Sequence, residues 1–236
     1  MVKIITEGAN GRYSVAQLLE IMKVLRSPGG CPWDREQTHK SIRNDALEEA
    51  YEVADAIDND DAVALCEELG DMLLQVVFHS CIASETEIFT FDDVVDGICK
   101  KLVLRHPHVF GEASADNSSQ VLDLWDSIKK EEKNQQTVSD TLKSVPKAFP
   151  ALMRAAKVQK RAQKAGVTAL VRLEELEACY TKLSQSVELG DKETIKSAYG
   201  EYLFKLAGFQ QTLKVDAEEA LNTITDSFIK SVEESE

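Results

Sequence analysis

The sequence lacks long apolar runs and an excess of positive charge, and each absence removes a class of protein. No stretch reaches the roughly 18 apolar residues of a membrane-spanning helix, and the first residues carry no signal-peptide core. We therefore expect no membrane association. The chain has 41 acidic and 27 basic residues, and its net charge of −14 argues against nonspecific binding to nucleic acids or anionic membranes.

Paired cysteines and a phosphate-binding loop are also missing. The five cysteines are scattered, and none belongs to a Cys-x-x-Cys pair, which argues against a disulfide framework and a zinc site. We therefore expect the reducing cytoplasm as the location. No G-x-x-x-x-G-K-[ST] motif occurs, so the chain is not a P-loop hydrolase. A polyanionic substrate would need a local basic patch or bound cations.

The feature around which the chain is organised is a helical hairpin over residues 47–79. Apolar residues recur at helical spacing in residues 47–57 and again in residues 62–78. The short segment Asp58–Asp61 between these two arms predicts that the helices run antiparallel.

Carboxylates lie beside both apolar stripes. Glu49 and Glu52 are three residues apart on the first arm, as are Glu68 and Asp71 on the second. Measured from the turn, the first pair lies about 10–15 Å along its helix and the second about 13–18 Å. Two charges 4 Å apart repel by about 4 kcal/mol at an effective dielectric of 20, so converging acids favour a bound cation over solvated side chains. All-oxygen ligands select a hard cation such as Mg²⁺ or Mn²⁺.

Basic and aromatic residues follow the hairpin on two further predicted helices. Lys101 and Arg105 share one face of a helix that His106–Pro107 ends. Trp125 and Lys129 share one face of the next helix.

Three side chains are candidates for contacts with a substrate. Trp33 follows the Gly- and Pro-rich loop 27–32, where it can stack on a nucleobase or equally cover the core. Trp125 can likewise serve the substrate or helix packing. Asn117, in the small polar loop 111–119, is the third candidate.

The pattern Glu48-Glu49-x-x-Glu52 followed by Glu68-x-x-Asp71 resembles the signature of the all-α nucleoside triphosphate pyrophosphohydrolases, and within them the MazG family. Supporting stretches are Gly30-Cys31-Pro32-Trp33-Asp34, Arg105-His106-Pro107-His108-Val109-Phe110 and Pro150-Ala151-Leu152-Met153-Arg154-Ala155. The resemblance implies an all-α fold of two tandem related helical bundles, a homodimer, and Mg²⁺-dependent hydrolysis of NTP or dNTP to a monophosphate and pyrophosphate, with Mn²⁺ as a possible substitute.

The resemblance also assigns roles to particular residues. It implies that the metal is held by four carboxylates, those of Glu49, Glu52, Glu68 and Asp71. Glu48 is expected to be a further ligand or to orient the attacking water. The phosphates are expected to be clamped by three basic residues, namely Lys101, Arg105 and Lys129. Trp33, Asn117 and Trp125 are expected on the substrate side.

The second half of the chain resembles a degenerate repeat of the first. Gly200-Glu201-Tyr202 resembles Gly70-Asp71-Met72, but only Glu177 and Glu201 remain as possible ligands. We expect a catalytic domain over residues 1–133, a linker over 134–150, and a degenerate structural or dimerising domain over 151–236.

Two alternatives stay open at this point. One is a narrower enzyme of the same superfamily, acting on dUTP or phosphoribosyl-ATP. The other is a non-catalytic helical module that senses nucleotides through a vestigial site.

Overall fold

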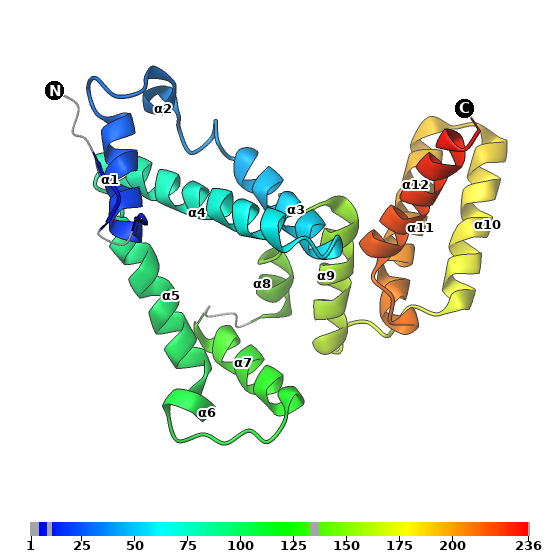
Figure 1. Cartoon of the computed structure of the whole chain (residues 1–236). Helices are drawn as coiled ribbons and strands as arrows, with labels where there is room; N and C mark the ends of the chain where they lie inside the picture. Colours follow the sequence, from blue (N-terminus) through cyan, green and yellow to red (C-terminus); the bar gives the residue numbers. More distant parts are fainter. Residues whose placement is uncertain (1–4, 9–10, 133–136, 236) are drawn as a thin grey trace. The chain divides into compact units, whose positions relative to one another are not determined.

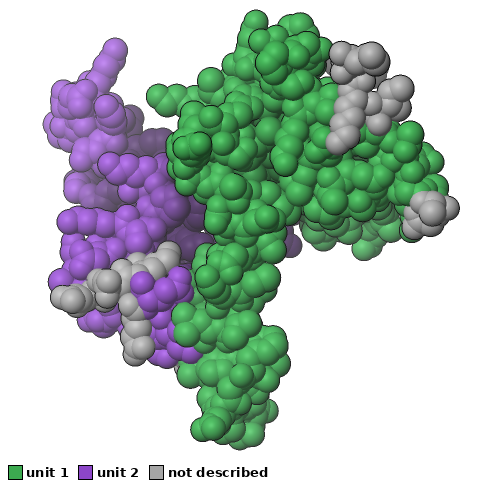
Figure 2. Space-filling view, turned by 90° about the vertical axis from the view of Figure 1, so that its left-hand side faces the viewer, with its two compact units in different colours: residues 1–125 green, residues 126–236 purple. Residues whose placement is uncertain are grey.

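The computed structural model describes residues 5–8, 11–132 and 137–235, and all the regular elements in these ranges are α-helices (Figure 1). The predicted all-α class is therefore confirmed. The chain divides into two compact units, Met1–Trp125 and Asp126–Glu236, which Figure 2 shows in green and purple. Over the described ranges, no helix is both long enough and apolar enough to cross a membrane.

The first unit is built around the predicted hairpin, which is confirmed. Its helices are α1 (Val15–Arg26), α2 (Pro32–Glu36), α3 (Asp45–Asp58), α4 (Ala62–Glu85), α5 (Phe91–Arg105) and α6 (Pro107–Phe110), with the start of α7 (Ser118–Glu132). Helix α3 packs along α4. The turn needs Asp60 at a φ of 53°, and the Asp61 carboxylate then accepts the N–H groups of Val63 and Ala64 at 3.0 Å. Asp61 thus caps α4 and fixes where the second arm begins.

The core of the first unit lies where α1 crosses the second half of α4. Met22, Ile42, Val77 and Phe78 are buried against one another. Helix α1 begins after Ser14, which forms a capping box with Gln17. This core holds the far end of α4, whereas the hairpin turn projects beyond it.

Helix α5 begins and ends where its sequence signals predict. Thr90 precedes the helix and forms a capping box with Asp93. The helix stops at Arg105, and His106 precedes Pro107, which favours an extended backbone before it. Helix α7 begins after Asn117, whose side-chain oxygen accepts the Gln120 N–H at 3.0 Å.

The second unit holds the rest of α7, α8 (Val138–Lys143), α9 (Ala151–Lys164), α10 (Leu173–Leu189), α11 (Lys192–Leu213) and α12 (Ala217–Glu233). Helices α10 and α11 form another hairpin, with Gly190 in the left-handed region at φ 74° and Asp191 capping α11. Helices α8, α11 and α12 pack on α9. The segment 134–150, expected as a linker, thus contains a helix that packs on α9.

Several predicted apolar stripes are not buried within the chain. On α4, Leu69 is 50% exposed and Val76 is 38% exposed, and on α3 Tyr51 is 58% exposed. Periodicity correctly identifies an apolar face, but it does not identify what covers that face.

Candidate active site

The hairpin brings three of the four predicted metal ligands together. Glu49 comes from α3, and Glu68 and Asp71 come from successive turns of α4. One carboxylate oxygen of each lies within 4.8 Å of the others. Antiparallel packing and three-residue spacing are sufficient to produce this group, which we call the carboxylate cluster.

The electrostatics of the carboxylate cluster are repulsive. The pKa of Glu49 is raised, first by its removal from water and then by the charges of Asp71 and Glu52. The pKa of Glu68 is raised by the same desolvation and then by Glu52 and Asp71. The protein therefore holds anions close together although each disfavours the charge of the next.

Glu52 and Glu48 occupy different places around the cluster. Glu52 is near enough to raise the pKa values of both Glu49 and Glu68, but it is not part of the group within 4.8 Å. Glu48 is exposed and also lies outside that group. The predicted roles of Glu52 and Glu48 at a metal therefore stay predictions.

Gln75 is a residue of the site that sequence reasoning missed. Its Nε2 lies 3.5 Å from Glu49 Oε1, and its own Oε1 is buried without a hydrogen-bond partner among the described residues. It follows Asp71 by four residues, one helical turn, and that spacing was the signal available in the sequence.

The cluster fits a hard divalent cation. Its donors are all carboxylate oxygens, which Mg²⁺ and Mn²⁺ prefer. A cation would remove the mutual repulsion that raises the two pKa values. Because Mg²⁺ keeps several waters, those waters could also donate to the unpartnered Gln75 oxygen.

The predicted phosphate-binding residues lie on other helices. Lys101 is exposed on α5. Arg105 is only 7% exposed, and its guanidinium lies 5.2 Å from the centre of the Trp125 ring. Lys129 lies one turn beyond Trp125 on α7. The charged groups that raise the pKa of Glu68 are all acids, so none of these three basic residues is among them.

Trp33 lies on the short helix α2, not on a loop as predicted, because Pro32 is favoured at the first position of a helix. Its ring is 58% exposed and meets Phe78 edge to face, with 6.5 Å between centroids. Trp33 therefore covers part of the core and also offers a free face to a planar ligand.

Arg26 fixes the position of that tryptophan. Its side chain is 5% exposed and forms a two-pronged ion pair with Glu85, with Nε–Oε1 at 2.5 Å and Nη2–Oε2 at 2.7 Å. Nη1 donates to the carbonyl oxygens of Asp34 and Gln37, which lie within and just after α2. One guanidinium thus joins α1, α2 and the end of α4.

A histidine pair makes a second link to α4. The Nδ1 atoms of His39 and His79 lie 2.8 Å apart. The 5.1 Å between ring centroids equals that distance plus two ring radii, and the planes differ by 10°. The rings therefore meet edge to edge, and the Nδ1–H of one ring donates a hydrogen bond to the Nδ1 of the other. The pKa of His79 is lowered by burial and then by His39.

An all-α protein with a carboxylate cluster between antiparallel helices is the class that the geometry defines. Residues 37–110 match the MazG nucleotide pyrophosphohydrolase domain, a span that contains the whole cluster. The Escherichia coli (strain K12) nucleoside triphosphate pyrophosphohydrolase is 41% identical over 230 residues, which cover 94% of this chain and 87% of that protein. The chain therefore belongs to the MazG family, and the predicted resemblance is confirmed.

Two other relatives define the extent of the similarity. The Thermotoga maritima protein named nucleoside triphosphate pyrophosphohydrolase/pyrophosphatase MazG is 37% identical, over 93% of this chain and 84% of its own length. The uncharacterized Bacillus subtilis protein YabN is 41% identical, but the chain spans only 43% of its length.

Proposed function

We propose that this protein hydrolyses nucleoside triphosphates to nucleoside monophosphates and pyrophosphate, with Mg²⁺ as the cofactor and Mn²⁺ as a possible substitute. The observation that supports it most directly is the carboxylate cluster of Glu49, Glu68 and Asp71. Relatives named for this activity align over most of the chain. The activity would serve nucleotide-pool housecleaning in the cytoplasm.

In this proposal the carboxylate cluster holds the cation, and Glu52 completes or adjusts the ligand set. A bound divalent cation lowers the pKa of a coordinated water and offsets phosphate charge. Gln75 holds Glu49 in place through its amide. We assign Glu48 the role of orienting the attacking water.

The phosphates require positive charge that the cluster does not supply. We assign Lys101, Arg105 and Lys129 to the oxygens of the departing pyrophosphate, where charge accumulates as the bond breaks. Water held near the cluster would then attack the α-phosphorus, and pyrophosphate would leave as one unit. Trp33, Asn117 and Trp125 would contact the nucleoside. Since Asn117 caps α7 through its oxygen, its amide NH₂ is the group it could offer.

We also propose that the protein acts as a homodimer. The chain exposes 17071 Å². Two separate compact proteins of half its mass would expose about 12,800 Å² together. The exposed area of this chain is larger than that value. On α4 and α5 the exposed surface includes apolar side chains, namely those of Leu69, Leu73, Ile98 and Leu102. A partner copy over these faces would bury them and could bring basic residues to the cluster. Light scattering after gel filtration would test the mass.

The direct experiment is pyrophosphate release from each common NTP and dNTP, with and without Mg²⁺. We expect metal-dependent release from several substrates, since an exposed Trp33 face tolerates any base. Release from one substrate alone would indicate a narrower enzyme. No release under any metal condition would overturn the proposal.

A further inference from the structure

Each unit has a hollow at the same place in its own helical arrangement. In the first unit a hollow of about 240 Å³ lies between α1, the end of α4 and the start of α5. In the second unit a hollow of about 430 Å³ lies between α9, the end of α11 and the start of α12. The second hollow is the larger, although its unit has lost most of the candidate metal ligands.

The linings of the two hollows correspond when Gly70 is matched with Gly200. Positions Ser80, Cys81 and Ser84 of α4 then fall on Gln210, Gln211 and Lys214. The helix caps Thr90 and Asp216 each stand at the start of the helix that follows, α5 and α12, although the same match pairs Thr90 with Ala220. The hollow is therefore a feature of the repeated architecture, and its lining has changed between the copies.

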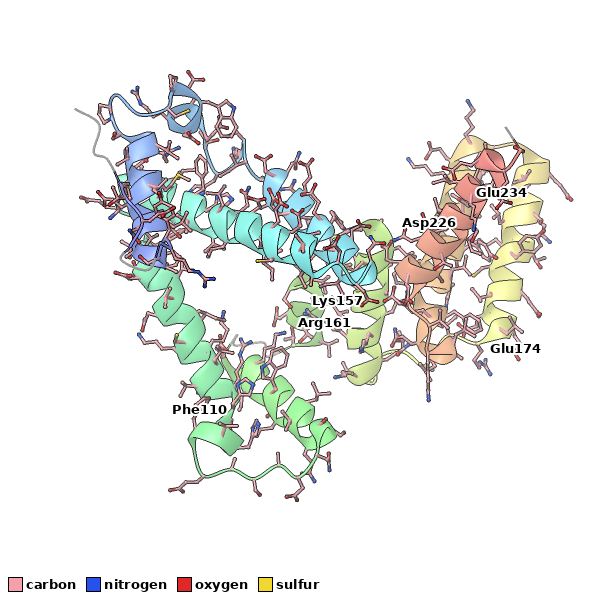
Figure 3. The ribbon with its side chains drawn as sticks, viewed as in Figure 1. Phe110, Lys157, Arg161, Glu174, Asp226 and Glu234 are labelled. Atoms are coloured by element: carbon pink, nitrogen blue, oxygen red, sulfur yellow. The ribbon has the colours of Figure 1, made fainter. Side chains whose placement is uncertain are left out.

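Positive charge is the main difference. The first hollow contains one lysine, Lys23, whereas the second is lined by Lys157, Lys160 and Lys214. Lys157, labelled on α9 in Figure 3, lies 5.0 Å from the centre of the Phe149 ring. Within the described ranges, no carboxylate lies within 4 Å of the amines of these three lysines.

The acids that line the second hollow are already used by the backbone. Asp216 Oδ1 accepts the N–H groups of Glu218 and Glu219 at 2.9 and 3.2 Å. Glu218 Oε1 accepts the Met153 N–H at 3.2 Å. Their charges are partly satisfied at helix starts, while the ammonium groups opposite lack such partners. Three lysines against two acids give the hollow a net positive charge, in a chain whose own net charge is −14.

The wall also carries an unused donor and an apolar surface. The Nε2 of Gln211 is buried and has no hydrogen-bond partner among the described residues. A buried donor without a partner costs free energy, which an acceptor on a ligand would recover. The remaining lining is largely apolar and consists of Leu152, Met153, Ala156, Val215 and Ala217.

From this combination we propose that the hollow of the second unit binds a small phosphorylated ligand that also has an apolar part. Lys157, Lys160 and Lys214 contact the phosphate oxygens, Gln211 donates its amide, and the apolar part lies on Met153 and Val215. A volume of about 430 Å³ is within the range of small-molecule sites. This site goes beyond the proposed catalytic function, and its lining residues belong to the second unit, whereas the carboxylate cluster belongs to the first. The second, degenerate half of the chain would thus retain a ligand site after losing its metal site.

The test is calorimetric titration of the full chain in EDTA with two probes, inorganic tripolyphosphate and ATP. We expect one site per chain that weakens as salt rises, with ATP the tighter ligand because its base reaches the apolar wall. The variant Lys160→Gln/Lys214→Gln should weaken both probes about tenfold or more, since charge-assisted hydrogen bonds are strong. Val215→Glu, at a position that is 51% exposed, should also weaken them by placing a carboxylate in the hollow.

Matched controls separate this site from general charge effects and from catalysis. Lys192→Gln/Lys196→Gln removes the same charge from exposed positions elsewhere on α11 and should leave binding within about twofold. Asp71→Ala should also leave it unchanged in EDTA. Equal weakening in the two lysine pairs, tighter binding of tripolyphosphate than of ATP, or binding that survives Val215→Glu would overturn the proposal. A change of oligomeric mass on Lys160→Gln/Lys214→Gln would instead assign the hollow to an interface.

Discussion

Removing one carboxylate from the cluster should abolish most of the stabilisation that we expect from Mg²⁺. If the wild type binds a cation at the carboxylate cluster, as proposed, that cation relieves the repulsion among Glu49, Glu68 and Asp71 and stabilises only the folded chain. At ten times its dissociation constant it adds about 1.4 kcal/mol. For a unit of this size that corresponds to a rise of about 5 °C in the melting temperature. Glu49→Gln removes a ligand and one repelling charge, so the metal-free protein should melt at the same temperature or higher, and most of the Mg²⁺ shift should disappear.

The assay is differential scanning calorimetry in EDTA and at several Mg²⁺ and Mn²⁺ concentrations. Glu67→Gln is the matched control, because it removes the same charge from an exposed neighbour outside the cluster and should keep the shift. A wild-type melting temperature that responds to neither cation would refute the reasoning, as would an equal loss of the shift in the control.

Three further predictions concern parts of the chain outside the cluster. Glu177→Ala and Glu201→Ala should each keep turnover within about twofold, since substitutions on a surface rarely cost more than about 0.5 kcal/mol. A large loss from either, measured as pyrophosphate release, would make the second half catalytic. Arg26→Ala should destabilise the first unit by about 2 kcal/mol in urea unfolding and shift Trp33 fluorescence, because it removes a buried guanidinium that donates to two carbonyl oxygens at α2 and so frees α2. An unchanged emission spectrum would contradict that role. His79, whose pKa is lowered, should contribute stability above its unfolded pKa of about 6.5 that is lost as the pH falls through the lowered value. His79→Phe should therefore unfold with a flatter dependence on pH between 7 and 5, and equal slopes would count against the pairing.

Local signals in the sequence were sufficient for the hairpin and its neighbours. Asp61 caps the second arm, Thr90 caps α5, and Pro107 ends it, all through contacts within a few residues. The convergence of Glu49, Glu68 and Asp71 also followed from helix geometry, because the height along an antiparallel pair depends only on residue counts.

What the sequence could not supply depends on contacts between distant segments. Glu52 raises the pKa values of Glu49 and Glu68 but lies outside the group within 4.8 Å, a difference that depends on how α3 rotates against α4 and that residue counts do not report. Its role as a metal ligand stays a prediction. Arg26 binds both α2 and Glu85. Because Arg26 and Glu85 are 59 positions apart in the chain, no periodicity in the sequence indicates this contact. The roles of Lys101 and Lys129 as phosphate ligands stay predictions. The exposed faces of their helices would complete the site only together with a second copy of the chain.

The measurement that tests the central proposal most directly is hydrolysis of ATP in ¹⁸O-labelled water with Mg²⁺. In the proposed reaction, water activated at the carboxylate cluster would attack the α-phosphorus, and the basic residues would stabilise the departing pyrophosphate. We therefore expect the label in AMP and none in pyrophosphate, with ADP absent as the first product. Lys101→Ala should slow this reaction more than it weakens Mg²⁺ binding, because its partner is the leaving group. Label in orthophosphate, or ADP as the first product, would contradict the account.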